Sequence, residues 1–312
     1  MMRFRVLAGT IALAAALAAC GSSSNPVGST SGASAAAGSA SGSASGGVIT
    51  VGSANFPENA LLAEIYAGAL SSKGVTVTKK LNIGSREAYI PGLQDGSIDL
   101  IPEYTGNLLA YFDKKSTATS AADVYAALPK VLPSTLKVLD QSQAEDKDAI
   151  VVTKETADKY KLTTIADLAA VAKDLVLGGP PEFETRVDGI PGLKEKYGVT
   201  FQQFKKLDAG GPLTINALKN GQVQAADVFT TDPSISTNGW VALGDPKSLY
   251  TAQNVVPLVN GAKASDAVSS ALNAVSAKLD TKTLTGLVAQ VVTDKKDPAV
   301  VAADWLKSSG LG

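Results

Sequence analysis

Apolar and polar stretches alternate from residue 48 onward in a way that predicts strands and helices in turn. Val48–Val51 is a short apolar run of the kind that forms a buried strand. Pro57 suits the first turn of a helix, and apolar residues at 61, 62, 65 and 69 then follow with helical spacing. Val75 and Val77 alternate as in a second strand. This order predicts a parallel sheet covered by helices.

The segment 83–107 contains a predicted helix, a glycine turn, a strand and the start of another helix. We expect Ser85 to cap the first helix and Asp95-Gly96 to end it with positive φ. Ile98–Ile101 is expected to be a buried strand, followed by Glu103-Tyr104-Thr105-Gly106 at its end. Open α/β sheets bind ligands outside the carboxyl ends of their strands, so this segment is a candidate site.

The same pattern returns 125 residues later, with Leu218–Val223 matching Leu93–Ile98. In the same register, Phe229-Thr230 matches Tyr104-Thr105. Two similar units with an aromatic residue and a threonine at the same strand end predict two lobes that face each other across a cleft. The alternative is that any two α/β units share such a pattern by chance.

Two segments are expected to connect the lobes, the first because it is polar and lacks a clear period. Gln141–Asp148 is predicted to cross out of the first lobe, and Tyr250–Pro257 to return to it. The predicted lobes are therefore 48–143 together with 254–312, and 144–253. Other expected elements are helices at Asp123–Leu132, Thr164–Ala172 (with Thr164 and Asp167 at capping-box spacing), about 264–278 and about 298–307, and strands at Leu136–Leu139, Ala149–Thr153 and Leu175–Gly178.

Composition excludes several classes of function. The chain has 28 Lys and Arg against 29 Asp and Glu, so it lacks the basic surface that nucleic-acid binding requires. It has no histidine, which removes Ser-His-Asp and Cys-His catalysis and histidine-ligated metals. Cys20 is the single cysteine, so an internal disulfide is impossible. We expect neither a cofactor nor a metal.

The N-terminus predicts export. Arg3 and Arg5 precede an apolar run of about 14 residues, which is too short to span a membrane in the mature protein. The run ends in Leu17-Ala18-Ala19-Cys20-Gly21, which resembles a bacterial lipobox. The resemblance implies a signal peptide at 1–19, lipidation of Cys20, and an extracytoplasmic protein tethered through the Ser/Gly/Ala-rich segment 20–47. The alternative is an ordinary secretory signal with a chance cysteine.

GSREAYIPGLQDGSIDLIPEYTGN (84–107) is similar to the signature of the ProX-like glycine betaine/choline-binding proteins of ABC importers. The similarity continues through GGPPEFETRVDGIPGLKEKYG (178–198) and Phe229–Pro233, and covers essentially all of 48–312. It implies an α/β, two-lobe periplasmic-binding-protein fold of type II, with two parallel or mixed sheets flanked by helices and a two-strand hinge. It also implies a monomeric receptor without enzymatic activity, which delivers its ligand to an ABC permease and its ATPase.

In such a family the ligand's quaternary ammonium is held by aromatic faces, because it has no hydrogen-bond donors. The resemblance makes Tyr104 a cage residue, with Phe229 where the family often has another tyrosine. Phe56 and Phe183 follow strands of the two lobes and are candidate cavity walls. The alternative for each of these rings is packing in the core.

Arg186 is the candidate anchor for a ligand carboxylate, and its alternative role is an ion pair with Glu182 or Glu184 across the lobes. Further polar contacts are expected from Asn55, Arg86, Thr105, Thr230, Thr231 and Asp232.

One departure from the family pattern broadens the expected ligands. Leu213-Thr214-Ile215 stands where the family tends to have a further cage tyrosine, and aromatic residues make up only 5% of the chain. A bulkier or neutral solute is therefore an alternative to betaine or choline. A hydrolase that pairs Glu103 with Asp232 or Glu182 is a rival of another class. A binding-protein fold reused as an adhesin or sensor is a second rival.

Overall fold

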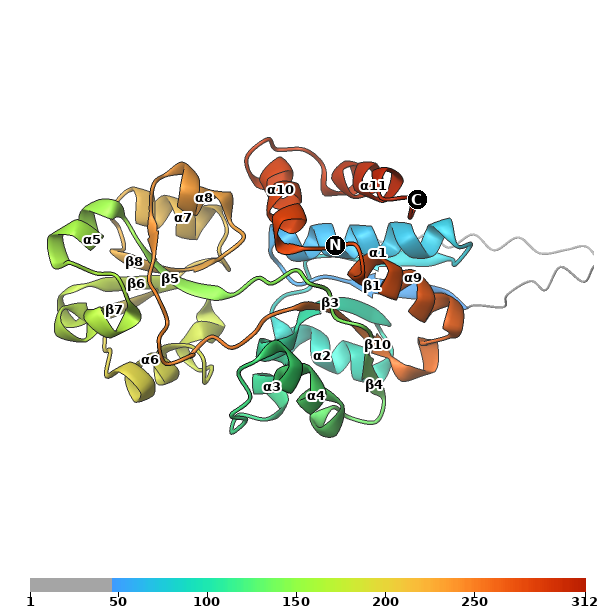
Figure 1. Ribbon diagram of the computed structural model, residues 1–312, viewed down its shortest axis with the longest axis horizontal. Helices are drawn as coiled ribbons and strands as arrows, with labels where there is room; N and C mark the ends of the chain where they lie inside the picture. The colour runs from blue at the N-terminus through green and yellow to red at the C-terminus, as the bar shows by residue number, and fades with distance from the viewer. Residues whose placement is uncertain (1–46) are drawn as a thin grey trace, which may run out of the picture. The chain divides into compact units, whose positions relative to one another are not determined.

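The structure is a computed structural model that describes residues 47–312. These residues form two five-stranded mixed sheets, each the centre of one lobe (Figure 1). The predicted signal peptide, Cys20 and nearly all of the predicted tether lie outside the described residues. Within 47–312, no helix combines the length and apolarity that a membrane span requires.

Lobe 1 is built on a sheet with the strand order β2-β1-β3-β10-β4. Strands β1, β2 and β3 are parallel, whereas β10 runs antiparallel to both of its neighbours. The strands are β1 (Ile49–Gly52), β2 (Val77–Lys80), β3 (Leu100–Tyr104), β4 (Leu136–Val138) and β10 (Val255–Asn260).

Lobe 2 repeats this topology with the strand order β7-β6-β8-β5-β9. Here β6, β7 and β8 are parallel, and β5 lies antiparallel between β8 and β9. The strands are β5 (Asp148–Val152), β6 (Val176–Gly179), β7 (Gln203–Lys206), β8 (Ala225–Phe229) and β9 (Val241–Ala242). Position by position, β8 is the counterpart of β3, and β5 is the counterpart of β10.

Helices cover both faces of each sheet, so each lobe has two apolar layers. The helices of lobe 1 are α1 (Pro57–Ser72), α2 (Arg86–Asp95), α3 (Thr105–Phe112), α4 (Ala121–Val131), α9 (Asp266–Ser276), α10 (Thr281–Val292) and α11 (Pro298–Ser308). Those of lobe 2 are α5 (Lys154–Tyr160), α6 (Ile190–Tyr197), α7 (Pro212–Lys219) and α8 (Pro233–Thr237). Short 3₁₀ helices are η1 (Ile165–Ala170), η2 (Ala172–Asp174), η3 (Pro181–Glu184) and η4 (Gly261–Lys263).

The chain passes between the lobes twice, through 139–147 and 250–254, which together form the hinge (Figure 1). The two segments run side by side: the Val255 amide donates to Ala144 O at 2.9 Å, and the Asp146 amide donates to Gln253 O at 3.1 Å. The return segment is shorter than predicted, because β10 already begins at Val255.

Several predicted boundaries require correction. The strand expected at Ile98–Ile101 occupies Leu100–Tyr104, so Glu103 and Tyr104 belong to the strand and the next helix begins at Thr105. Ser85 is the N-cap residue of α2, but its hydroxyl donates to Glu87 Oε2 at 2.7 Å and does not cap the backbone.

Other differences concern element type. The Thr164–Ala172 helix is two 3₁₀ turns, although its capping box with Asp167 is present. Helix α10 was not predicted, because TKTLTGLVAQVV mixes β-branched residues and a glycine that favour other structures. The second strand begins at Val77, two residues later than the alternation suggested.

Candidate functional site

The sequence repeat places two aromatic residues at equivalent strand ends. Gly96 and Gly221 take positive φ angles of 79° and 66°, which turn the chain from α2 toward β3 and from α7 toward β8. Tyr104 ends β3 opposite Val255, the first residue of β10. Phe229 ends β8 opposite Asp148, the first residue of β5. Both side chains therefore lie where the hinge joins a sheet.

These strand ends border a small cavity of about 50 Å³ between the lobes. Both lobes and the hinge contribute to its lining, as expected for a ligand site that closes by lobe movement. The cavity is lined by Ala54, Asn55, Phe56, Ser85, Arg86, Tyr89, Tyr104, Asn107, Asp146, Asp148, Pro180, Glu182, Arg186, Ala209 and Phe229.

Three rings form the aromatic wall of the cavity. Phe56 lies between the other two, with ring centroids 6.0 Å from Tyr104 and 4.9 Å from Phe229. Tyr104 is 6% exposed, and its hydroxyl donates to Glu58 Oε1 at 2.7 Å. Phe56 and Tyr104 belong to lobe 1 and Phe229 to lobe 2, so the wall is complete only when the lobes are together.

No aromatic side chain occupies the position of the missing family tyrosine. Leu213 is 64% exposed there, and Thr214 is buried with its amide donating to Asp208 Oδ1 at 2.8 Å. Neither residue lines the cavity, which on the lobe 2 side includes Ala209. The aromatic wall therefore consists of Phe56, Tyr104 and Phe229, while Tyr89 lines the cavity beside the Arg86–Glu103 pair.

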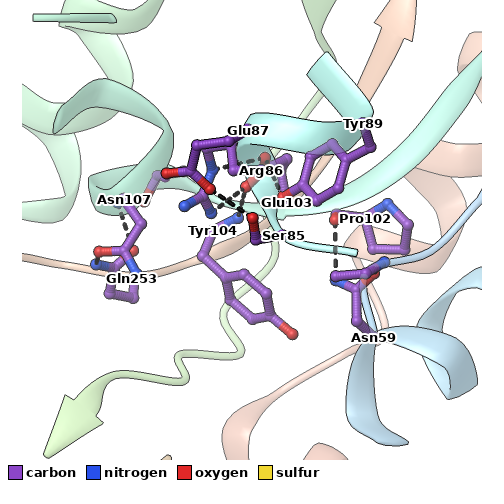
Figure 2. Close-up of polar contacts among 12 residues, drawn as sticks. Asn59, Ser85, Arg86, Glu87, Tyr89, Pro102, Glu103, Tyr104, Asn107 and Gln253 are labelled. Carbon is purple, nitrogen blue, oxygen red and sulfur yellow. Dashed lines mark hydrogen bonds and ion pairs between the residues drawn. The ribbon is translucent and has the colours of Figure 1, made fainter. Parts of the chain in front are cut away.

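A buried ion pair fixes one arginine beside the cavity (Figure 2). Arg86 donates from Nε and Nη2 to the two oxygens of Glu103 at 2.8 and 2.7 Å, and Tyr89 donates to the same carboxylate at 2.7 Å. The Tyr104 amide adds a fourth bond at 3.0 Å, while the Tyr104 ring points away from this cluster (Figure 2). Burial alone would lower the pKa of Arg86, but the Glu103 charge raises it well above its usual value.

A second arginine reaches the cavity from lobe 2. Arg186 donates from Nε and Nη2 to Glu87 of lobe 1 at 3.1 and 2.9 Å, and its Nη2 lies 3.9 Å from Glu182 Oε1. Burial and the nearby charge of Arg86 disfavour the protonated form of Arg186, yet Glu87 keeps its pKa above the usual value. Within residues 47–312, Nη1 of Arg86 and Nη1 of Arg186 make no hydrogen bond.

Carboxyl groups in the hinge and next to it lie on the same side of the cavity. Asp148 accepts from Asn107 Nδ2 of lobe 1 at 2.8 Å. Asp146 accepts from the Thr231 amide at 3.0 Å and lies beside Glu58, which accepts from the Thr231 hydroxyl at 2.5 Å. Burial raises the pKa of both Glu58 and Asp146.

Some residues predicted from the sequence lie elsewhere. Phe183 is 4% exposed and packs in the lobe 2 core, with its ring centroid 6.3 Å from that of Phe204. Thr105 is buried and donates to Ala252 O at 3.2 Å, so it binds the hinge. Thr230 accepts from the Lys147 amide at 2.9 Å, and Asp232 caps α8 by accepting from the Ser234 amide at 2.7 Å. Asn55, by contrast, does line the cavity, with its side chain exposed at the rim.

The sequence reasoning missed the roles of Glu58, Asp146, Asp148 and Asn107. The acidic hinge segment and the acidic first turn of α1 were visible in the sequence, but neither pattern indicates which carboxyls are buried. Glu58 and Asp146 are buried where Thr231 of lobe 2 contacts the N-terminal turn of α1 and the hinge.

The carboxylates do not form a hydrolytic pair. Glu103 is fully buried and accepts four hydrogen bonds, including two from Arg86, so it has no face open to a substrate. Asp232 caps a helix and does not line the cavity. Among residues 47–312, no group of histidine, cysteine or acidic side chains is arranged to hold a metal ion.

Comparison with known proteins identifies the family. Residues 47–308 match the model of the substrate-binding domain of ABC-type glycine betaine transport systems. The glycine betaine-binding protein YehZ of Escherichia coli is 30% identical over 84% of this chain and 90% of its own. The ergothioneine transport permease/ergothioneine-binding protein EgtU of Helicobacter pylori is 27% identical over 84% of this chain and 48% of its own.

A solved structure of a glycine betaine/carnitine/choline ABC transporter protein shares the fold, with a TM-score of 0.66 and 23% identity over 84% of this chain and 99% of its own. The two-lobe fold predicted from the sequence is thereby confirmed. The chain belongs to the family of substrate-binding domains of ABC-type glycine betaine transport systems.

Proposed function

We propose that the protein is an extracytoplasmic receptor that binds a zwitterionic quaternary ammonium compound of the glycine betaine class and delivers it to an ABC permease. The observation that carries this proposal is that one cavity is lined by two kinds of side chain: three aromatic rings on one wall and two arginines on another. A betaine has a methylated cation at one end and a carboxylate at the other, so both walls have a partner. The receptor performs no chemistry on its ligand.

The rings of Phe56, Tyr104 and Phe229 are the proposed ammonium site. A quaternary ammonium is recognised through aromatic faces and desolvation, and each cation–π contact contributes about 0.5–2 kcal/mol. Because Phe229 comes from lobe 2 and the other two rings from lobe 1, the cation gains its third contact only when the lobes close. This differential contact is what allows a ligand to shift the equilibrium toward the closed form.

Arg86 and Arg186 are the proposed carboxylate site. Each guanidinium uses Nε and Nη2 in a fork with a glutamate, which fixes its orientation and leaves Nη1 for the ligand. The two arginines also come from different lobes. A ligand without a carboxylate gives these donors no partner, so we expect glycine betaine to bind more tightly than choline.

Calorimetric titration of refolded, ligand-free protein with glycine betaine, carnitine, ergothioneine and choline tests the proposal. We expect the zwitterions to bind and Tyr104→Ala to abolish or strongly weaken their binding. Arg186→Gln removes the pair with Glu87 for every ligand, and it should weaken zwitterions more than choline because they also lose a partner for their carboxylate. Lys206→Gln is the matched control, since Lys206 is a lobe 2 cation paired with Glu184 outside the cavity. Equal binding of choline and glycine betaine would contradict the carboxylate site.

We also propose the architecture around the binding domain. A lipobox-like sequence that ends at Cys20 supports lipid anchoring, with 20–47 as the tether of a monomer. Mass spectrometry of the membrane fraction would detect the lipid on Cys20, and Cys20→Ser should release the protein. The contacts between the crossing segments support lobe boundaries at 143/144 and 253/254.

A further inference from the structure

Glu58 connects the proposed ligand cavity to both lobes. It lies in the first turn of α1 and is 4% exposed. One of its carboxyl oxygens accepts from the Tyr104 hydroxyl at 2.7 Å, and the other accepts from the Thr231 hydroxyl at 2.5 Å. Tyr104 is a wall of the cavity in lobe 1, whereas Thr231 follows β8 in lobe 2. A single carboxyl group therefore positions a cavity ring and holds the opposite lobe.

Asp146 of the hinge completes this arrangement. It is 4% exposed, lines the cavity, and accepts from the Thr231 amide at 3.0 Å and from the Thr230 hydroxyl at 3.2 Å. Asp146 and Glu58 both bind Thr231, so their carboxyl groups are neighbours. Thr231 thus donates its hydroxyl to one carboxyl and its amide to the other, and it comes from the lobe that must move away on opening.

The charges around this pair do not neutralise it. Within residues 47–312, neither Glu58 nor Asp146 forms an ion pair with a lysine or arginine. The other titratable groups that act on the pair are Asp232 beside Glu58, Asp148 beside Asp146, and the Tyr104 hydroxyl. The two aspartates oppose a second negative charge on the pair, whereas the Tyr104 hydroxyl donates its hydrogen bond to Glu58 and helps to hold the one charge there. Two adjacent buried carboxyls without a cation cannot both ionise, and one of them keeps a proton.

We propose that Glu58 and Asp146 share one proton in the closed form, and that this protonated pair couples lobe closure to the positioning of Tyr104. With one proton the pair carries a single negative charge beside the cavity, which complements the ammonium group of the proposed ligand. When lobe 2 leaves, both Thr231 bonds are lost and water reaches the carboxyls. The proton then dissociates at neutral pH, so ligand binding and closure take up a proton from solution. This inference rests on the proposed function for the identity of the ligand only.

The sign of the pH effect follows from linkage. Burial raises the pKa of both carboxyls in the closed form, and opening returns them toward ordinary acidic values. At pH values between the ordinary pKa of a carboxyl group and the raised pKa in the closed form, the closed form binds more protons than the open form. Lowering the pH within this window therefore favours the closed form. Affinity for the ligand should decrease as pH rises through this window, by at most about tenfold per pH unit because one proton is involved.

Calorimetric titration with glycine betaine at several pH values, in buffers with different ionisation enthalpies, measures this uptake. We expect the wild-type protein to take up as much as one proton per ligand and to bind more weakly as pH rises. Glu58→Gln keeps the shape of the side chain but has one acceptor oxygen in place of two, so we expect weaker binding together with the loss of proton uptake and of pH dependence. Glu58→Ala should weaken binding at every pH, because Tyr104 and Thr231 lose their common acceptor.

Glu64→Gln is the matched control, since Glu64 lies on the same helix and its partner is Lys79. It should leave both affinity and proton uptake unchanged. Binding without proton uptake in the wild-type protein, or unchanged uptake in Glu58→Gln, would overturn the proposal.

A second measurement keeps the test independent of the ligand's identity. Infrared difference spectra between wild type and Glu58→Gln at neutral pH should show a carboxylic acid band that only closed wild-type protein has, because any band of the buried Asp227 is common to both and cancels. If glycine betaine fails to bind but the band is present, the ligand assignment is wrong and the shared proton stands. If the band is absent from protein shown to be closed by small-angle scattering, the shared proton is refuted.

Discussion

Replacing Glu103 by glutamine tests the buried ion pair on which the orientation of Arg86 depends. Glu103→Gln preserves the shape of the side chain but removes the charge that faces the Arg86 guanidinium. Glu103 is fully buried and the Arg86 side chain is 6% exposed, so solvent cannot take over the role of the lost carboxylate. A charge left unpaired in the interior destabilises a protein by about 3–5 kcal/mol.

Unfolding in urea, followed by circular dichroism, gives the change in free energy directly. For a domain of this size each kcal/mol of lost stability lowers the Tm by roughly 2–4 °C, so the Tm of Glu103→Gln in thermal unfolding should fall by about 6–20 °C. The matched control is Glu64→Gln, which removes a partly exposed pair with Lys79 at 2.8 Å and should cost less than about 1 kcal/mol. A double variant, Arg86→Met with Glu103→Leu, should be less destabilised than Glu103→Gln, because it buries no charge.

A loss in Glu103→Gln no larger than that in Glu64→Gln would refute this reasoning. The carboxylate would then not neutralise Arg86, and the argument that the fork leaves Nη1 for a ligand carboxylate would lose its basis.

Three further predictions concern the hinge and the contact between the lobes. Gly106→Ala should destabilise the protein by about 1–3 kcal/mol in urea unfolding, because a Cβ there would lie 2.6 Å from the Ala252 carbonyl oxygen. Unchanged stability would mean that the hinge backbone moves to accommodate the methyl group without cost. Thr105→Val should lose about 1–3 kcal/mol in the same assay, since it leaves the Ala252 carbonyl without its 3.2 Å partner, whereas Thr105→Ser should be nearly silent. Burial opposes ionisation of Glu87, but bonds from Arg186 and Ser85 lower its pKa to about 2. The pair of Glu87 with Arg186 should therefore stabilise the closed form fully at any pH above the ordinary pKa of a glutamate, and this stabilisation should be lost as pH falls toward about 2. Small-angle scattering measures closure as the radius of gyration. If this radius is as insensitive to pH in wild type as in Glu87→Gln, the prediction is wrong.

Much of the binding-domain fold could be predicted from local patterns. The repeat of helix, glycine turn, strand and aromatic-threonine pair depends on residues close together in sequence, and it led to Tyr104 and Phe229 at equivalent strand ends. Positive φ at Gly96 and Gly221 is likewise a local requirement. Such features are visible without knowledge of tertiary contacts.

The rest depended on partners far away in sequence. The strand β3 was predicted to end at Ile101, where the apolar run ends, yet it continues through Glu103 because Arg86 neutralises this carboxylate from a neighbouring helix. Phe183 has the sequence context of a cavity wall, but packing against Phe204 directs it into the core. The roles of Glu58 and Asp146 arise only when lobe 2 covers them, and no local pattern encodes that burial.

Strand β10 also determines the order in which the chain can acquire its structure. Lobe 2 is assembled from one continuous stretch, β5 to β9, so every strand it needs is present once residue 242 has been synthesised. Lobe 1 cannot fold until the C-terminal segment has been synthesised, because β4 pairs with β10 and the apolar layer over α1 is completed by α9 to α11. Pairings between distant segments form late, since the intervening chain must first be brought together. A nascent chain that stops before Val255 would therefore consist of a folded lobe 2 attached to an N-terminal half that cannot yet fold.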